Sequence, residues 1–146
     1  MTEILIKKLS KNISLPKYQT DESSGMDLVA NIKDDLEIAP GKTSIIPTGL
    51  AVSIPKNFEI QIRPRSGLAA KNQISVLNTP GTIDADYRGE IKVILINLSD
   101  KIFKIQNGLR IAQMVLCPVV KAELKEVDLL EETNRGEGGF GSTGNK

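Results

Sequence analysis

Two carboxylates and a tyrosine lie close together in the stretch LNTPGTIDADYRGE, which contains Asp84, Asp86 and Tyr87. In a strand, Asp84 and Asp86 would share a face, and like charges that close repel each other. The pair therefore needs a counter-ion, a metal ion, or a bulge or turn that separates it. Asn78 precedes them, and its amide donates and accepts together, which suits the edge of a nucleobase. The alternative is a hairpin whose acids face solvent.

A second stretch, RPRSGLAAK, has the groups that bind phosphate. We expect a short helix over residues 66–72, with Ser66 as its cap. Its first turn, with the N–H groups of Gly67 and Leu68, offers unpaired donors and the positive end of the helix dipole. Arg65 adds a planar donor fork that matches phosphate oxygens. The alternative is a capped helix beside a solvated arginine.

Two further stretches place a polar side chain within apolar sequence. In SSGMDLVAN, Asp27 follows a Ser-Ser-Gly turn, and it either caps that turn or faces a site. In NGLRIAQMVL, Asn107 and Gly108 indicate a tight turn, and Gln113 is an amide inside an apolar strand. A buried amide needs partners, so Gln113 is either a satisfied core residue or one that faces a ligand.

Apolar periodicity predicts the strands that must position these residues. In FEIQIRPRS, Phe58, Ile60 and Ile62 alternate with polar residues, the period of a half-buried strand. TGLAVSIP repeats this pattern, whereas KVILIN and AQMVLCPVV are continuous apolar runs that suggest strands covered on both faces. The turn-forming stretches APGK, IPK, NTPG and LSDK separate the runs. Many short strands at this spacing predict a sandwich, jelly roll or barrel.

The composition is that of one soluble globular domain, with 146 residues, 40% hydrophobic and 25% charged. A formal charge of +1 implies no general attraction to nucleic acid, and no run approaches the roughly 18 apolar residues of a membrane helix. The start, MTEILIKKLS, is unlike a signal peptide. With no histidine and one cysteine, His-based triads and ordinary zinc sites are excluded. Cys117 is expected to fill the core, and its lone occurrence fits a reducing compartment.

The chain changes character after Val120. KAELKEVDLLEETN is acidic and weakly periodic, so it is either a marginal helix or an extended arm that leaves the domain. The stretch RGEGGFGSTG then has five glycines in ten residues, which cannot hold a helix or strand by themselves. It nevertheless carries Phe140, a guanidinium and two hydroxyls.

Together these stretches resemble the five sequence motifs of the trimeric dUTP diphosphatases (dUTPases), in order and over nearly the whole chain. The motifs are similar, in turn, to SSGMDLVA, RPRSGLAAK, NTPGTIDADYRGEIKVILIN, NGLRIAQMVL and RGEGGFGSTG. The resemblance implies an all-β, distorted jelly roll of the β-clip type with one short helix, assembled as a homotrimer that exchanges C-terminal arms. It divides the chain into a core over 1–120, an arm over 121–134 that crosses to a neighbouring subunit, and a flexible glycine-rich lid over 135–146.

The resemblance also implies a cytoplasmic enzyme that hydrolyses dUTP to dUMP and pyrophosphate with Mg²⁺, at three sites between subunits. This reaction keeps uracil out of DNA and supplies dUMP for thymidylate synthesis. Neither nucleic acid nor a membrane is an expected partner. Asp84 corresponds to the carboxylate that orients the attacking water and bonds the 3′-OH. Tyr87 would lie under the sugar, where its ring leaves no space for a 2′-OH.

The remaining roles that the resemblance implies fall into three groups. The uracil edge would be bonded by Asn78 and by backbone groups around Thr82, Ile83 and Lys92. Phosphates would be contacted by Arg65, Ser66, Gly67 and Gln113, while Asp27 would hold the hydrated metal ion through water. In the lid, Phe140 would stack on uracil, and the γ-phosphate would be surrounded by Arg135, Gly141, Ser142 and Thr143.

Two other functions are compatible with this fold. A dCTP deaminase would attack the base and would need a general acid/base glutamate beside C4, whereas the third motif here supplies Asp84 and Tyr87. Ammonia release from dCTP would identify that activity. A dUTP-sensing regulatory module would bind nucleotide and signal to a partner, and a pull-down with a non-hydrolysable analogue would detect it.

Overall fold

Residues 2–142, which the computed structural model describes, form ten strands and one helix. In chain order these are β1 (Leu5–Lys8), β2 (Met26–Val29), β3 (Leu36–Ile38), β4 (Thr43–Ser53), β5 (Phe58–Arg63), α1 (Ser66–Asn72), β6 (Ile74–Val76), β7 (Gly81–Ile83), β8 (Glu90–Asn97), β9 (Phe103–Ile105) and β10 (Arg110–Pro118). This part of the chain contains no helix with the length and apolarity that crossing a membrane requires.

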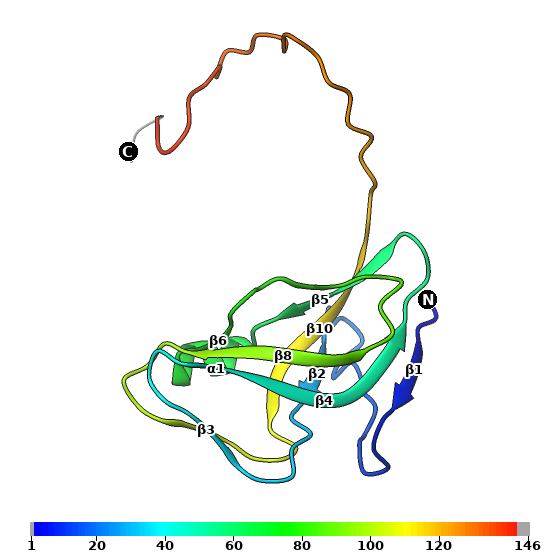
Figure 1. Ribbon diagram of the computed structural model, residues 1–146, viewed down its shortest axis with the longest axis vertical. Coiled ribbons are helices and arrows are strands. Elements are labelled where there is room, and N and C mark those ends of the chain that lie inside the picture. Colours follow the sequence, from blue (N-terminus) through cyan, green and yellow to red (C-terminus); the bar gives the residue numbers. More distant parts are fainter. Residues whose placement is uncertain (1, 143–146) are drawn as a thin grey trace.

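The strands form two four-stranded antiparallel sheets and one small ribbon (Figure 1). One sheet has the order β1-β4-β8-β6, the other has the order β2-β10-β5-β7, and β3 pairs with β9. Buried side chains of both large sheets, such as Ile46 and Leu95 from the first and Leu28 and Ile60 from the second, join in one core cluster. The expectation of an all-β fold with one short helix is therefore confirmed.

The alternation in β5 has the predicted effect. Ile60 and Ile62 are buried in the core, and the intervening polar residues lie on the opposite face. The expectation that β8 is covered on both faces is wrong for a single chain. Its buried residues alternate with the exposed Lys92 and the half-buried Ile94, so only one face of β8 is fully covered.

Cys117, which we expected in the core, is half-buried on the outer face of β10. Its Sγ accepts a hydrogen bond from Nη2 of Arg63 at 3.5 Å. Its position follows from strand register, since Cys117 lies opposite Glu59, a polar residue of the outer face of β5. An apolar run in the sequence does not reveal which alternate residues turn away from the core.

The helix α1 begins and ends as predicted, but its cap differs. Arg65, in an extended conformation, is the N-cap residue, and no side chain caps the helix. Ser66 is the first helical residue, so its predicted capping role is wrong. At the other end Gln73 adopts a left-handed conformation and its N–H donates to the carbonyl of Ala69.

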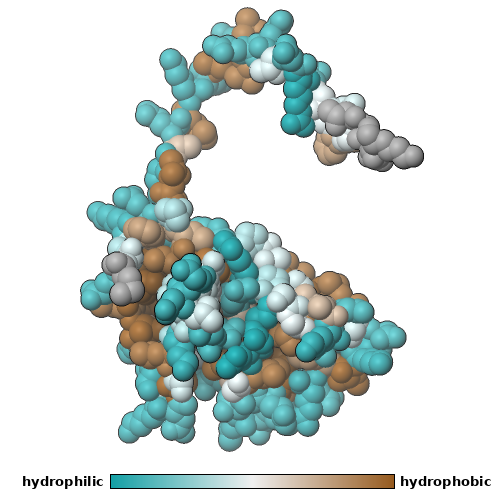
Figure 2. Space-filling model, turned by 180° about the vertical axis from the view of Figure 1, so that it is seen from behind, coloured by the Kyte–Doolittle hydropathy of each residue, from teal (hydrophilic) through white to brown (hydrophobic). Residues whose placement is uncertain are grey.

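After β10 the chain leaves the sandwich as an extended arm that arches away from it (Figure 1), so the alternative of a marginal helix is wrong. The Val119 N–H still donates to the Asn57 carbonyl at 2.8 Å. Farther on, the described hydrogen bonds join residues only a few positions apart, such as the bond from Arg135 Nε to the Gly138 carbonyl. Apolar side chains alternate with polar ones along the arm (Figure 2), and the most exposed of these include Val120, Leu124, Leu129 and Leu130.

Candidate active site

A pocket forms where the loop after β7 meets β8. Because β7 ends at Ile83, Asp84 and Asp86 lie in a turn, closed by a bond from the Tyr87 N–H to the Asp84 carbonyl at 3.1 Å. A turn is one of the arrangements that the sequence allowed for separating the two like charges of Asp84 and Asp86. The pocket encloses about 270 Å³ and is lined by Thr82, Ile83, Asp84, Tyr87, Glu90 and Lys92. The structure thus brings five of the predicted site residues together.

The Tyr87 ring is fixed by its neighbours in the loop. Its hydroxyl donates to the Glu90 carbonyl at 3.0 Å, and the ring occupies space that a Cβ on Gly89 would need. Nη1 of Arg88 donates to the carbonyls of Ala85 and Tyr87 at 2.7 and 2.9 Å and closes the loop. Sequence reasoning missed Gly89 and Glu90, although the dense charge and the glycine in DYRGE were visible signals.

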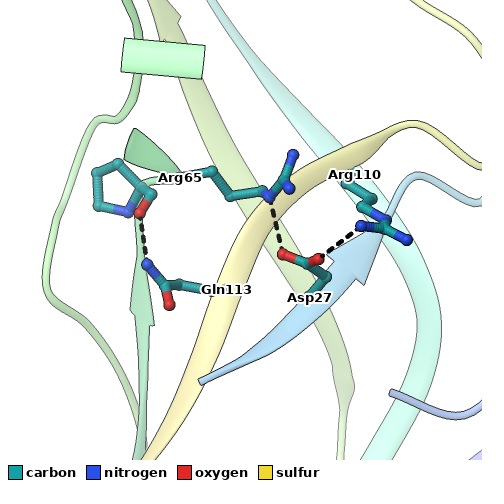
Figure 3. Close-up of polar contacts among 5 residues, drawn as sticks. Asp27, Arg65, Arg110 and Gln113 are labelled. Carbon is teal, nitrogen blue, oxygen red and sulfur yellow. Dashed lines mark hydrogen bonds and ion pairs between the residues drawn. The ribbon is translucent and has the colours of Figure 1, made fainter. Parts of the chain in front are cut away.

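A second group of predicted residues gathers on the outer face of the β2-β10-β5-β7 sheet, around Asp27 (Figure 3). Nε of Arg65 donates to Oδ1 of Asp27 at 2.7 Å, and Nη1 of Arg110 lies 3.3 Å from Oδ2. The Asp27 side chain is 18% exposed. Asp27 is therefore a carboxylate shared by two guanidinium groups, rather than a simple turn cap, and sequence reasoning missed Arg110.

Strand register explains how these residues meet. Gln113 on β10 lies opposite Asp27 on β2 and opposite Arg63 on β5. Arg65 follows β5 by two residues, and its side chain extends over β10 to reach Asp27 (Figure 3). Gln113 is a half-buried amide whose Nε2 donates to the Pro64 carbonyl at 3.0 Å. Its Oε1 lies 2.5 Å from where a Cβ on Gly25 would stand.

Ser66 and Gly67, the first residues of α1, are exposed beside Arg65. Asn78 lies in the turn before β7, also exposed, and its Nδ2 is 3.1 Å from the position of a Cβ on Gly81. It does not line the pocket around Tyr87. Asn78 thus lies beside the residues predicted to bind the nucleoside. Ser66 and Gly67 lie beside those predicted to bind phosphate.

The two groups lie apart within one chain. In the β5–β7 pair, Ile83 is opposite Ile60, so Asp84 lies near Glu59, whereas Arg65 follows the other end of β5. Glu59 and Arg65 are six positions apart, with four of these steps inside β5, and an extended chain of that length spans about 20 Å. Phe140 is fully exposed in the lid stretch, with Arg135, Gly141 and Ser142 nearby in sequence. Thr143 lies outside the described residues.

Neither group is a preformed metal cage, since residues 2–142 contain no cluster of three or more Asp, Glu, Cys or His side chains suited to a metal ion. Away from both groups, near the β3–β9 ribbon, Asp35 and Lys104 form an ion pair with shifted pKa values. Nζ of Lys104 lies 3.0 Å from Oδ2 of Asp35. The hydrogen bond from Lys104 lowers the pKa of Asp35, and the same bond raises the pKa of Lys104.

Comparison with known proteins gives one consistent result. The family model described as dUTPase matches residues 11–144. Deoxyuridine 5′-triphosphate nucleotidohydrolase of Gloeothece citriformis is 56% identical over 142 residues, which cover 97% of each chain.

Two solved structures resemble the fold. A substituted dUTPase of Staphylococcus bacteriophage 80alpha with dUpNHpp has a TM-score of 0.87, 28% identity and 99% coverage of both chains. A substituted dUTPase from phage phi11 of S. aureus, described with a structural Mg(II) ion, has a TM-score of 0.79 and 23% identity, over 89% of this chain and 99% of that one.

Proposed function

The chain belongs to the dUTPase family and hydrolyses dUTP to dUMP and pyrophosphate, and we propose that it does so at a site built by two copies of the chain. The observation behind this proposal is the separation of Asp84 and Tyr87 from Arg65 and Gln113 within one copy. Each group contains half of the chemistry that a nucleoside triphosphate requires. In an assembly of copies, the residues around Arg65 in one chain would lie against the pocket around Tyr87 in another.

The pocket around Tyr87 would hold deoxyuridine. The Tyr87 ring, fixed over Gly89, would lie against the sugar and exclude a 2′-OH. The uracil edge would be bonded by Asn78 and by backbone groups of Thr82, Ile83 and Lys92. Cytosine reverses donors and acceptors at that edge, and sites built on such bonds reject a mismatched partner by about 10⁴-fold. The Lys92 side chain is exposed, so its backbone is the part that would contact the base.

Asp84 would orient the attacking water and bond the 3′-OH. It lies in a turn at the pocket rim and its side chain is exposed, which leaves room for water and sugar. Phosphoryl transfer needs little covalent help from a protein, so placing the water in line and neutralising charge account for most of the catalysis.

The group around Arg65 would bind the phosphate chain. Arg65 uses Nε for Asp27, and neither of its Nη groups donates a hydrogen bond to a described residue, so both can donate to phosphate oxygens. The Ser66 hydroxyl, the Gly67 N–H and the Gln113 amide would add donors. Arg65 and Gln113 are held by Asp27 and by the Pro64 carbonyl before the substrate arrives, so they would stabilise negative charge with little reorganisation.

The residues fit a magnesium ion held mainly by the substrate. Mg²⁺ keeps several waters when it binds triphosphates, and a carboxylate has about four lone-pair positions. Asp27 gives one acceptor position to each guanidinium, so positions remain for a water of the hydrated ion. When bound, the ion would neutralise phosphate charge as the bond to the leaving group breaks.

The arm would complete the site of a neighbouring copy in a homotrimer. Its exposed apolar side chains need a surface to cover them, and the described arm residues beyond Lys121 make no hydrogen bond to their own sandwich. Phe140 would stack on uracil, while the γ-phosphate would be held by Arg135, Gly141, Ser142 and Thr143. Closing the lid, residues 135–146, would expel water and strengthen the electrostatic interactions within the site.

A substrate panel tests the reaction itself. With Mg²⁺, the purified protein should release pyrophosphate from dUTP and leave dCTP, dTTP and UTP nearly untouched. Ammonia release from dCTP would instead indicate a deaminase, an activity that the names of the relatives do not support. We place the reaction in the cytoplasm, where it would limit uracil in DNA and supply dUMP for thymidylate synthesis.

A further inference from the structure

Arg110 reaches Asp27 because of an irregularity in β10. In a regular strand, side chains alternate between faces, so Arg110, three residues before Gln113, would point to the opposite face. The β2–β10 register shifts between Arg110 and Ala112: Ala112 lies opposite Leu28, and Arg110 lies opposite Val29. Ile111 is the extra residue of a β-bulge, and Ile111 and Ala112 are both buried. Bulges re-aim side chains in this way, often next to active sites.

The bulge gives the Asp27 carboxylate a partner at each oxygen. Arg65 donates to Oδ1 through Nε at 2.7 Å, and Arg110 holds Oδ2 through Nη1 at 3.3 Å. Without Arg110, the carboxylate would be free to rotate into a two-bond pair with Nε and Nη2 of Arg65, a frequent geometry of arginine–carboxylate pairs. That pair would occupy a donor that the triphosphate needs.

We propose that Arg110 is a positioning residue for triphosphate binding: it holds Asp27 in a one-bond contact with Arg65, so that both Nη groups of Arg65 stay available to the substrate. This inference rests on the proposed function of Arg65. It assigns Arg110 no contact with the substrate. An ordinary exposed ion pair would contribute only about 0–1 kcal/mol to stability and would have no effect on a ligand.

The variants Arg110→Gln and Arg110→Lys test this role in the full-length protein, at about 0.15 M salt to screen long-range charge effects. Lys104→Gln is the control, because it breaks an exposed ion pair of similar length away from both groups. Arg110→Gln should weaken binding of a non-hydrolysable dUTP analogue roughly tenfold, as expected for the loss of one charge-assisted hydrogen bond. Arg110→Lys should restore most of that affinity, and Lys104→Gln should match the wild type.

Deoxyuridine, which has no phosphate, separates positioning from general damage. Its inhibition constant should stay within about twofold of the wild-type value in Arg110→Gln. An equal loss for deoxyuridine and the analogue, or an unchanged affinity for the analogue, would overturn the inference. Wild-type turnover of dUTP is measured alongside, so that failure of the proposed function is told apart from failure of the inference.

A double-mutant cycle with Asp27→Asn tests whether Arg110 acts through Asp27. An asparagine does not compete for the Arg65 guanidinium as a carboxylate does. Adding Arg110→Gln to Asp27→Asn should therefore change the affinity for the analogue by less than about twofold. A further tenfold loss in that background would mean that Arg110 contacts phosphate directly and would overturn the positioning role.

Discussion

The phenol ring of Tyr87 lies in the space that a methyl group on Gly89 would occupy. Gly89→Ala should therefore displace the ring from the pocket and weaken discrimination against a 2′-OH. We expect the ratio of kcat/KM for dUTP to that for UTP to fall at least tenfold, the effect of a lost steric contact of about 1.4 kcal/mol. Tyr87→Phe keeps the ring and loses only the bond to Glu90, so it should retain the discrimination. Equal ratios in Gly89→Ala and wild type would contradict this role for Tyr87.

A similar contact links Gly25 to Gln113, whose Oε1 lies 2.5 Å from the position of a Cβ on Gly25. Gly25→Ala should push the Gln113 amide away from the substrate phosphates. The loss of one hydrogen bond, about 1 kcal/mol, should raise KM for dUTP several-fold. In a Gln113→Ala background the same change should have little further effect on KM. If Gly25→Ala acts equally strongly there, its effect does not pass through Gln113.

Asp84 is the residue we expect to govern the chemical step. Asp84→Asn keeps the size of the side chain and removes the charge that orients the water. We expect kcat to fall at least a hundredfold, within the usual range for a positioned acid or base, while a non-hydrolysable dUTP analogue still binds. Single-turnover kinetics and calorimetry measure the two effects separately. Undiminished turnover would remove Asp84 from the mechanism.

The lid can be removed without touching the sandwich, because the described hydrogen bonds of residues 135–142 are local. A chain that ends at Asn134 should keep its thermal transition and its oligomeric state, and should lose most of its dUTP turnover. Circular dichroism, light scattering and pyrophosphate release check the three expectations. Full turnover in the shortened chain would show that residues 135–146 do not act as a lid.

Periodicity and turn residues predicted the elements of the fold well. The alternation in β5 and the position of α1 depend on local patterns, and both appear as expected. Lys92 exposed on β8 and Cys117 half-buried on β10 differ from expectation, because coverage of a face depends on what packs there. Local sequence does not contain that information.

The site divides in the same way. The resemblance selected Asp27, Arg65 and Gln113, which the structure brings onto one face of one sheet. It missed Arg110, because regular alternation along β10 predicts that this side chain points to the face opposite Gln113. Only the bulge turns it toward Asp27. It also missed Gly89, because the need for glycine there arises from a close approach by the Tyr87 ring. The bulge depends on how β10 pairs with β2, and the close approach depends on the conformation of one loop, so neither leaves a spacing signal.

Mixed assemblies of two variants test the proposed shared site, and the proposed trimer, most directly. Asp84→Asn and Arg65→Gln chains, each nearly inactive alone, are co-expressed with different affinity tags, and the mixed assembly is purified. If each site takes Asp84 from one copy and Arg65 from another, every mixed trimer contains one intact site and recovers about a third of wild-type turnover, as cyclic symmetry requires. If the mixed assembly stays as inactive as its parents, each site is built within one chain and the account is contradicted.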